Sequence, residues 1–338
     1  MKLPIPHRAP VLLRLLPVTL LTVVAAAGLA QDSDMSQQPG VEGLRAGAES
    51  GDAESLNAMG LAYRNGRGVM QSYERAAEFF RRAADKGNLA AQRNLGVLYA
   101  EGKGVKQDSA EAVNWLRKAA DQNFPGAQYQ LAVFYVDGKA PAPKADAALN
   151  LLRAAAERNY SEAQSLLAIL QIEGRGGVNR DYAEALKWAR KAADNNFASG
   201  QSTLGWMYAN GLGVETNFGT AVEMFRKAAD QRFADAQKNL GLMYERGQGV
   251  TQDYAEAAKW YRLAAERDFG GAQNRLAICC ALGHGEVKDA VEAYKWFALA
   301  KRHGDNDGAD IYAALLKEMT PEQIAEGDKR VKEFTPKN

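Results

Sequence analysis

The sequence repeats itself with a period of about 36 residues, and this constrains its fold more than any other feature. A glycine or alanine recurs in the same local pattern at Gly60, Gly96, Ala132, Ala168, Gly205, Gly241 and Ala277. The intervals are 36 residues except for one of 37, which comes from an extra glycine in the stretch EGRGGV. A fixed period of this length predicts stacked structural units, each of which contacts mainly its neighbours.

Each unit is predicted to form a helix, a glycine-containing loop and a second helix. In the sixth unit, Ala236, Leu240 and Tyr244 lie at four-residue spacing, which indicates one buried stripe on a helix over about residues 234–246. Gly247 follows where this helix ends, and a glycine there favours a left-handed C-terminal cap. The small residue Gly241 on the same stripe allows another helix to approach closely.

The second helix of a unit is marked by an aspartate followed three residues later by a glutamate, which predicts a capping box. The pairs are Asp108 and Glu111, Asp181 and Glu184, Asp253 and Glu256, and Asp289 and Glu292. A tryptophan follows on the expected apolar face at Trp115, Trp188, Trp260 and Trp296. In four of the seven units, therefore, the same residue types mark the start and the apolar face of this helix.

The full pattern, A-x-x-x-L-G-x-x-Y-x-x-G-x-G-V-x-x-D-x-x-x-A-x-x-W-x-x-x-A-A, resembles the Sel1-like repeat, a relative of the tetratricopeptide repeat. Seven units cover residues 53–304. The resemblance implies an all-α fold, a right-handed α-solenoid of about seven helix-turn-helix repeats. The departures are local: the third unit has a proline-bearing loop at residues 138–146, and Gln171 and Cys280 replace the tyrosine in two units.

Helical caps are predicted at both ends, because a terminal repeat lacks a neighbour on one side. Residues 43–52 align with the end of a second helix and are expected to form an N-terminal half-repeat. Residues 305–338 are expected to form capping helices. In that range Thr320, Pro321 and Gln323 mark a helix start, with the threonine as N-cap and the glutamine completing a capping box.

The first thirty residues are typical of an export signal. Lys2, Arg8 and Arg14 precede an apolar run that ends at Ala30 and is followed by a polar stretch. We therefore predict a signal peptide over residues 1–30, a flexible linker over 31–42, and a periplasmic or secreted bacterial protein. The alternative is an uncleaved anchor, which is the one route of membrane contact that the sequence suggests.

Charge gives no indication of a nucleic-acid partner. The formal net charge is +1, and residues 1–30 hold three basic and no acidic residues, so the remainder carries −2. Basic and acidic residues are interspersed on the expected helix surfaces, whereas binding of a polyanion requires a clustered basic face. The two cysteines, Cys279 and Cys280, are adjacent, which makes an ordinary disulfide between them difficult. We expect them to be core thiols.

The sequence predicts no catalytic, cofactor or metal site. Beyond the signal, the histidines are His284 and His303, and neither has a closely spaced second ligand. The stretch EGKGV at residues 101–105 departs from the phosphate-binding consensus and follows a helix. Some Sel1-like relatives with reported β-lactam binding or hydrolysis are cysteine-rich, and their cysteine pairs are absent here. A non-enzymatic protein is therefore predicted, with a cell-wall or β-lactam hydrolase as the alternative.

By analogy with tetratricopeptide repeats, four positions per first helix should line a concave groove. They lie six and three residues before, and one and four residues after, the small residue of each repeat. In units three to five the candidates are largely apolar, at Tyr129, Val133, Val136, Ile169, Ile172 and Trp206. Toward the ends they are charged, at Arg64, Arg93, Asp235, Lys238 and Glu245, and Leu242 of the sixth unit should also face the groove. The predicted partner is another protein or peptide, held by aromatic and apolar anchors.

Two other interpretations of these residues stay open. The side chains could pack only between neighbouring repeats, or the array could be a structural spacer that holds two partners apart and needs no groove. Related proteins are implicated in exopolysaccharide export, cell-wall assembly, sensor regulation and host contact. The resemblance selects none of these processes.

Overall fold

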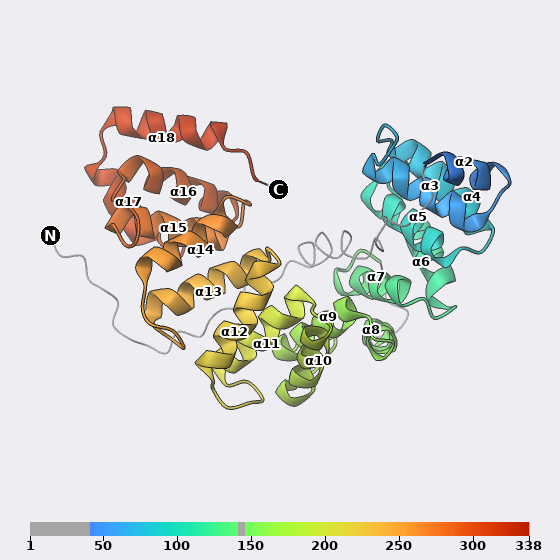
Figure 1. Cartoon of the computed structure of the whole chain (residues 1–338), viewed down its shortest axis with the longest axis horizontal. Helices are drawn as coiled ribbons and strands as arrows, with labels where there is room; N and C mark the ends of the chain where they lie inside the picture. Colours follow the sequence, from blue (N-terminus) through green and yellow to red (C-terminus); the bar gives the residue numbers. More distant parts are fainter. Residues whose placement is uncertain (1–40, 141–145, 338) are drawn as a thin grey trace. The chain divides into compact units, whose positions relative to one another are not determined.

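The computed structural model describes residues 41–140 and 146–337, and every regular element in these ranges is a helix (Figure 1). The helices of the first four repeats and the N-terminal cap are α2 (Val41–Glu49), α3 (Ala53–Asn65), α4 (Tyr73–Asp85), α5 (Leu89–Glu101), α6 (Ser109–Ala120), α7 (Pro125–Val136), α8 (Ala147–Glu157), α9 (Ser161–Glu173) and α10 (Tyr182–Asp194). Those that follow are α11 (Ala198–Asn210), α12 (Phe218–Asp230), α13 (Ala234–Arg246), α14 (Tyr254–Ala265), α15 (Gly270–Leu282), α16 (Ala290–Arg302), α17 (Ala309–Glu318) and α18 (Pro321–Glu333). The predicted signal peptide and the linker up to residue 40 lie outside the described residues. None of the described helices is long and apolar enough to cross a membrane.

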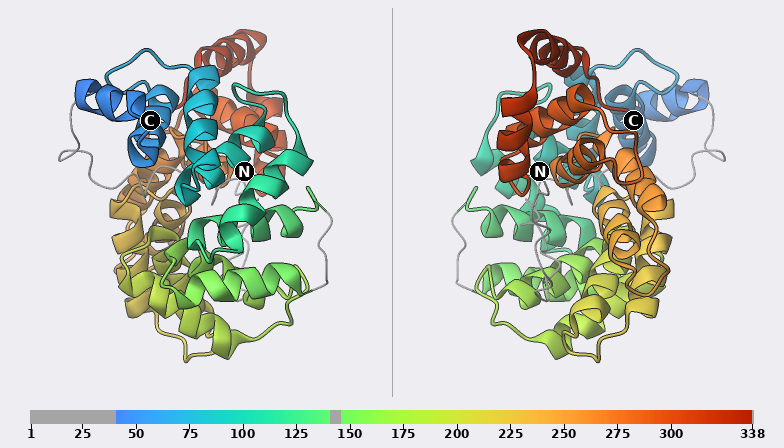
Figure 2. Two further views of the ribbon diagram at one scale, coloured as in Figure 1. Left: turned by 90° about the vertical axis from the view of Figure 1, so that its right-hand side faces the viewer. Right: turned by 90° about the vertical axis from the view of Figure 1, so that its left-hand side faces the viewer.

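The described chain divides into two compact units, an N-terminal unit of residues 41–191 and a C-terminal unit of residues 192–337. Within each unit, helices consecutive in sequence pack together as hairpins, for example α3 with α4 and α13 with α14. Each hairpin also packs on the next through its second helix, as α4 does on α5 and α14 on α15. Figure 2 shows this succession of hairpins from two sides. The predicted all-α solenoid of helix-turn-helix repeats is confirmed.

Where the small residue of a first helix is a glycine, it lies directly against a side chain of the second helix in the same hairpin. A Cβ atom on Gly60 would lie 2.5 Å from the Phe80 ring, and one on Gly241 would lie 2.5 Å from the Tyr261 ring. Each of these rings comes from the second helix of the same repeat and is fully buried. The sequence predicted a close approach at this position, and the structure identifies the group that fills the space.

The two glycines of each loop have different roles. Gly247 ends α13 in the left-handed conformation, with φ 64°, as the sequence predicted. Gly285, at φ 72°, lies against the backbone of Tyr254, the first residue of the second helix in the preceding repeat. A Cβ on Gly285 would overlap the Tyr254 carbonyl, and Gly104 and Gly249 make the corresponding contacts in other repeats. The second glycine of the loop therefore lies at a contact between neighbouring repeats.

The predicted capping boxes form in part. Asp253 accepts hydrogen bonds from the backbone N–H groups of Ala255 and Glu256, at 2.9 and 3.0 Å. The carboxylate of Glu256, however, pairs with Lys259 at 3.3 Å. The reciprocal contact is present at α18, where the Thr320 N–H donates to Gln323 and the Gln323 N–H donates to Thr320. Glu184, Glu256 and Glu292 each have a lysine three residues later, which offers the carboxylate a charged partner.

A buried glutamine near the start of most first helices ties that helix to the preceding one. Its side-chain amide donates to a backbone carbonyl in the last turn of the preceding second helix. The bonds are Gln92 to Ala84 at 3.2 Å, Gln128 to Ala120 at 3.4 Å, Gln164 to Ala156 at 3.0 Å, Gln237 to Ala229 at 3.3 Å and Gln273 to Ala265 at 3.3 Å. Each of these carbonyls also accepts the backbone N–H of the residue three positions on, so the glutamine adds a second hydrogen bond that comes from the next repeat.

Replacing Gly285 with alanine should destabilise the C-terminal unit more than replacing Gly304 with alanine. Both glycines have left-handed backbones, at φ 72° and 74°, so both variants lose about 1 kcal/mol from backbone strain. Only Gly285 faces a backbone atom, whereas a Cβ on Gly304 meets nothing within 4 Å. We expect Gly285→Ala to lose at least about 1 kcal/mol more. Urea unfolding followed by circular dichroism measures the difference, and equal losses would contradict the inter-repeat contact.

Candidate functional site

The structure places every predicted groove residue on a first helix. Those in the N-terminal unit are Arg64 on α3, Arg93 on α5, Tyr129, Val133 and Val136 on α7, and Ile169 and Ile172 on α9. Those in the C-terminal unit are Trp206 on α11 and Asp235, Lys238, Leu242 and Glu245 on α13. Their role in binding a partner stays a prediction. Within each unit, however, their surroundings can be compared.

The apolar candidates of the N-terminal unit lie on two helices that are buried on nearly all sides. Residues 126–135 of α7 and 162–172 of α9 are all buried. Tyr129 and Val133 are 1% exposed and Ile169 is 2% exposed, whereas Val136 and Arg93 are half-buried. Helices that are apolar all round are typical of an interior position. The central residues are therefore close-packed side chains, and the open part of this face is at Arg93 and Val136.

A polar cluster lies beside these apolar residues and joins three consecutive first helices. It contains Arg93 of α5, Tyr129 of α7, and Tyr160 and Glu162 at the start of α9. The Tyr129 and Tyr160 rings are 5.6 Å apart between centroids. Burial raises the pKa of Tyr129, of Tyr160 and of Glu162. The positive charge of Arg93 opposes the shift in the pKa of Glu162 and the shift in the pKa of each tyrosine.

Glu162 was not among the predicted residues, although it occupies a predicted groove position, six residues before Ala168. It is 1% exposed, and within the described part of the chain neither of its carboxylate oxygens has a hydrogen-bond partner. The repeat register alone could have identified it. The sequence analysis selected apolar residues in the central repeats and so passed over the one acidic side chain among them.

In the C-terminal unit, the charged candidates are paired inside the protein. Lys238 is 6% exposed, and its ammonium group lies 3.1 Å from the carboxylate of Asp235. Glu245 accepts a hydrogen bond of 2.6 Å from the hydroxyl of the buried Tyr261 and lies 3.7 Å from Arg275. Pairing of this kind offsets the cost of burying a charge. Lys238 and Glu245 therefore have partners of their own in the free protein.

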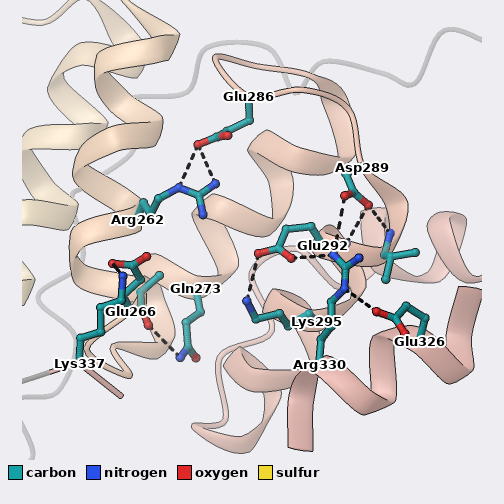
Figure 3. A network of polar contacts seen from close by, with 12 residues as sticks. Arg262, Glu266, Gln273, Glu286, Asp289, Glu292, Lys295, Glu326, Arg330 and Lys337 are labelled. Carbon is teal, nitrogen blue, oxygen red and sulfur yellow. Dashed lines mark hydrogen bonds and ion pairs between the residues drawn. The ribbon is translucent and has the colours of Figure 1, made fainter. Parts of the chain in front are cut away.

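A network of ion pairs attaches the last helix to the last repeat (Figure 3). Arg330 of α18 lies 3.1 Å from Glu292 and 3.9 Å from Asp289, both at the start of α16, and 3.0 Å from Glu326 of its own helix. Lys295 pairs with the same Glu292 at 3.1 Å. Lys295 of α16 and Arg330 of α18 thus share the carboxylate of Glu292, and this holds the last helix against the last repeat.

The chain after α18 continues this seal across a shallow pocket of about 310 Å³. Phe334 packs edge-on against Trp296, with centroids 5.6 Å apart. Lys337 donates its backbone N–H to the Glu266 carbonyl at 2.8 Å, and its ammonium group pairs with the Glu266 carboxylate at 2.9 Å. The cations on the pocket wall, which are Arg262, Lys295, Arg330 and Lys337, each have a carboxylate partner.

The residues most suited to chemistry are arranged for packing in this structure. Cys279 and Cys280 are 4% and 2% exposed, and burial raises the pKa of each thiol to about 12. His303 lies 2.9 Å from Asp268, and His284 contacts the Tyr254 ring. Across residues 41–140 and 146–337, no three His, Cys, Asp or Glu side chains are grouped to hold a metal ion. A neutral thiol is a poor nucleophile, because the thiolate is the reactive form.

Comparison with protein families identifies the repeats. The model of the Sel1 repeat matches seven successive segments, residues 53–88, 89–124, 125–160, 161–197, 198–233, 234–269 and 271–305. The chain belongs to the Sel1 repeat family. The resemblance inferred from the sequence is thereby confirmed, and the family matches cover the range that was predicted. The search of curated proteins found no match to the chain.

Solved structures of other Sel1 repeat proteins resemble this one. A protective antigen present in uropathogenic Escherichia coli strains, displaying an SLR fold, is 32% identical with a TM-score of 0.73. The match covers 87% of this chain and 63% of that one, so the Sel1 repeat protein described here spans less than two thirds of its length. A Sel1 repeat protein from Oxalobacter formigenes is 29% identical with a TM-score of 0.64, covering 83% of this chain and 80% of that one.

The thiols of Cys279 and Cys280 should be unreactive in the folded protein at pH 8. With each pKa near 12, only about one thiol in ten thousand is ionised at that pH, and burial also blocks access. Titration with Ellman's reagent should therefore label the protein rapidly in 6 M guanidinium and hardly at all without it. Rapid labelling of the folded protein would show that a thiol is activated and would reopen the case for catalysis.

Proposed function

We propose that this Sel1 repeat protein is an exported, non-enzymatic scaffold of the bacterial cell envelope that binds a partner protein or peptide along its first-helix face. The observation that carries the proposal is the concentration of large apolar residues at groove positions of α7 and α9. Tyr129, Val133, Ile169 and Ile172 stand at the expected groove positions of these two helices and are buried there. Buried aromatic and aliphatic anchors of this kind supply most of the binding energy in protein interfaces.

The burial of these anchors bears on how binding would proceed. Tyr129, Val133 and Ile169 are almost without exposed surface, so a partner contacts them only after the side chains over them move aside. Val136 and Arg93 are half-buried on the same face and offer a first contact. Docking would therefore begin at these two residues and extend toward the tyrosine, with a modest rearrangement of the kind common in regulatory complexes.

The non-enzymatic part of the proposal rests on the state of the groups that could act in catalysis. The two thiols are neutral and buried, and the described residues contain no grouped metal ligands. The rival function is a cell-wall or β-lactam hydrolase. Purified protein that turned over muropeptides or a chromogenic β-lactam, and lost this activity through a point substitution, would establish that rival.

Replacing Tyr129 with alanine should weaken partner binding at least tenfold, because truncation of a buried aromatic anchor typically costs more than 1 kcal/mol. Partners are captured from envelope extract by crosslinking and mass spectrometry, and the affinity of each purified partner is then measured by calorimetry. Met70→Ala is the control, since Met70 is 89% exposed and lies in a loop away from this face. Circular dichroism verifies that both variants fold. Unchanged affinity for every partner of the folded Tyr129→Ala variant would reject the first-helix face and favour a spacer.

If the protein is exported and its signal peptide is cleaved, the mature chain should start at Gln31. The apolar run that ends at Ala30 has basic residues before it and polar residues after it, as a cleaved signal requires. Expression in a Gram-negative host, fractionation and N-terminal sequencing provide the measurement. Replacing Leu20 with arginine should hold the protein in the cytoplasm, because a charge interrupts the apolar run. Recovery of the unchanged chain in the cytoplasm with Met1 intact would refute export.

A further inference from the structure

Glu162 is a buried acid whose own repeat provides no partner for it. Its side chain lies in the first turn of α9 with 1% of its surface exposed, and neither carboxylate oxygen accepts a hydrogen bond within the described residues. The hydroxyl of Tyr129, whose ring contacts that of Tyr160, is also buried without a partner. Buried charges without hydrogen bonds are costly, so proteins rarely keep one without a use.

Other repeats show how an acid at this position is normally satisfied. Six residues before the small residue, an acid also occurs at Glu54 in the first repeat and Asp235 in the sixth. Glu54 accepts a hydrogen bond of 2.8 Å from the side-chain amide of Asn88. Asp235 accepts from Ser202 and Asn239, each at 3.0 Å, and pairs with Lys238 at 3.1 Å. Of these three acids, only Glu162 lacks a well-formed side-chain hydrogen bond in the described part of the chain. The Tyr160 hydroxyl and the charge of Arg93 act on its carboxyl, but burial has the larger, opposite effect and raises its pKa.

The three donors around Asp235 are replaced around Glu162. In the repeat register, Ser202 corresponds to Tyr129, Lys238 to Ser165 and Asn239 to Leu166. The ammonium group at the position of Lys238 is thus lost, and an aromatic ring stands where Ser202 would be. The acid has been kept while the lysine of this position has been removed, and the one charge that acts on it comes from Arg93 on another first helix, among the described residues. This arrangement is what a site needs if the cation is to come from another molecule.

The sixth repeat also shows that an aromatic ring suits such a cation. The ammonium group of Lys238 pairs with Asp235 and lies 5.8 Å from the centroid of the Phe269 ring. Beside Glu162, the Tyr129 and Tyr160 rings occupy a comparable setting, 5.6 Å from each other. A cation near a desolvated aromatic ring gains about 0.5–2 kcal/mol, in addition to its attraction to the carboxylate.

We propose that Glu162, flanked by Tyr129 and Tyr160, receives a basic side chain of the bound partner segment, a lysine or an arginine. The inference rests on the proposed function, and it specifies the chemistry of the partner: an apolar segment with one central basic residue. Apolar flanks match Val133 and Ile169, and the cation supplies the charge that the fourth repeat lacks. Burial raises the pKa of Glu162, and the nearby charge of Arg93 opposes that shift. Arg93 would also repel a second cation, so a single basic residue is favoured.

The test compares two peptides that differ only in one charge. Fluorescein-labelled nonapeptides of leucine and alanine carry either lysine or norleucine at the centre, and their affinities for the full chain are measured by fluorescence anisotropy. The unchanged protein should bind the lysine peptide about tenfold more tightly, since a desolvated charge pair in an interface is worth at least that factor. This comparison needs no variant and therefore does not depend on any variant folding.

Two glutamine variants then assign the preference to one carboxylate. Glu162→Gln should reduce affinity for the lysine peptide to that for the norleucine peptide and leave the latter unchanged. Glu157→Gln is the matched control, because Glu157 is exposed on α8 of the same unit, and it should keep the tenfold preference. A preference that persists in Glu162→Gln, or equal binding of both peptides to the unchanged protein, would overturn this inference while leaving peptide binding intact. Failure of both peptides to bind would overturn the inference together with the apolar binding face.

Discussion

The packing of a small first-helix residue against a large second-helix side chain is the contact on which this structure depends. Gly60 lies against Phe80 and Gly241 against Tyr261, with no room for a Cβ atom between them. Because the two helices meet so closely, a short loop connects them and one hairpin needs only about 36 residues. Protein interiors are close-packed, so enlarging either side of the contact would force the helices apart.

Neighbouring hairpins are joined by a second set of contacts, which come from the loop glycines and from glutamine side chains near the start of the first helices. The second loop glycine lies against the backbone of the preceding repeat, and the buried glutamines donate to carbonyls at the end of the preceding helix. Each contact reaches only the adjacent repeat, as expected for a solenoid. The ends must therefore be sealed differently. At the C-terminus, Arg330 and Phe334 cover polar and aromatic groups that a further repeat would otherwise cover.

The groove positions of the first helices differ from one repeat to another, and we expect the residues that determine function to be among them. On α13 the charges at these positions are neutralised within the protein, with Lys238 on Asp235 and Glu245 beside Tyr261. On α7 and α9 the corresponding residues are apolar except for Ser165 and Glu162, and neither carboxylate oxygen of Glu162 has a hydrogen-bond partner in the described residues. The contrast arises from a single register of positions. In the sixth repeat the acid Asp235 has its partners within the protein, whereas in the fourth repeat Glu162 is proposed to take a basic side chain from a bound partner.

Much of this fold was predictable from the sequence because it depends on local patterns of residues. The period, the helical stripe of the sixth repeat, the cap at Gly247 and the helix start at Thr320 all depend on residues a few positions apart. Such contacts arise from the geometry of one helix or one turn, and the sequence displays them directly. The family resemblance extended the same local pattern to seven repeats.

What the sequence determined by itself was therefore the array, its hairpins and its helical ends. The tertiary structure decided the rest: that Gly285 contacts the preceding repeat, that Glu256 pairs with Lys259, and that Asp235 is satisfied while Glu162 is not. The first and last of these depend on groups about thirty residues away. Glu256 could reach either the backbone N–H of Asp253 or the ammonium group of Lys259, each three residues away in sequence, and in the folded protein it pairs with Lys259. Sequence spacing identifies which groups can be neighbours, but only packing in three dimensions determines which buried charge is left without a partner.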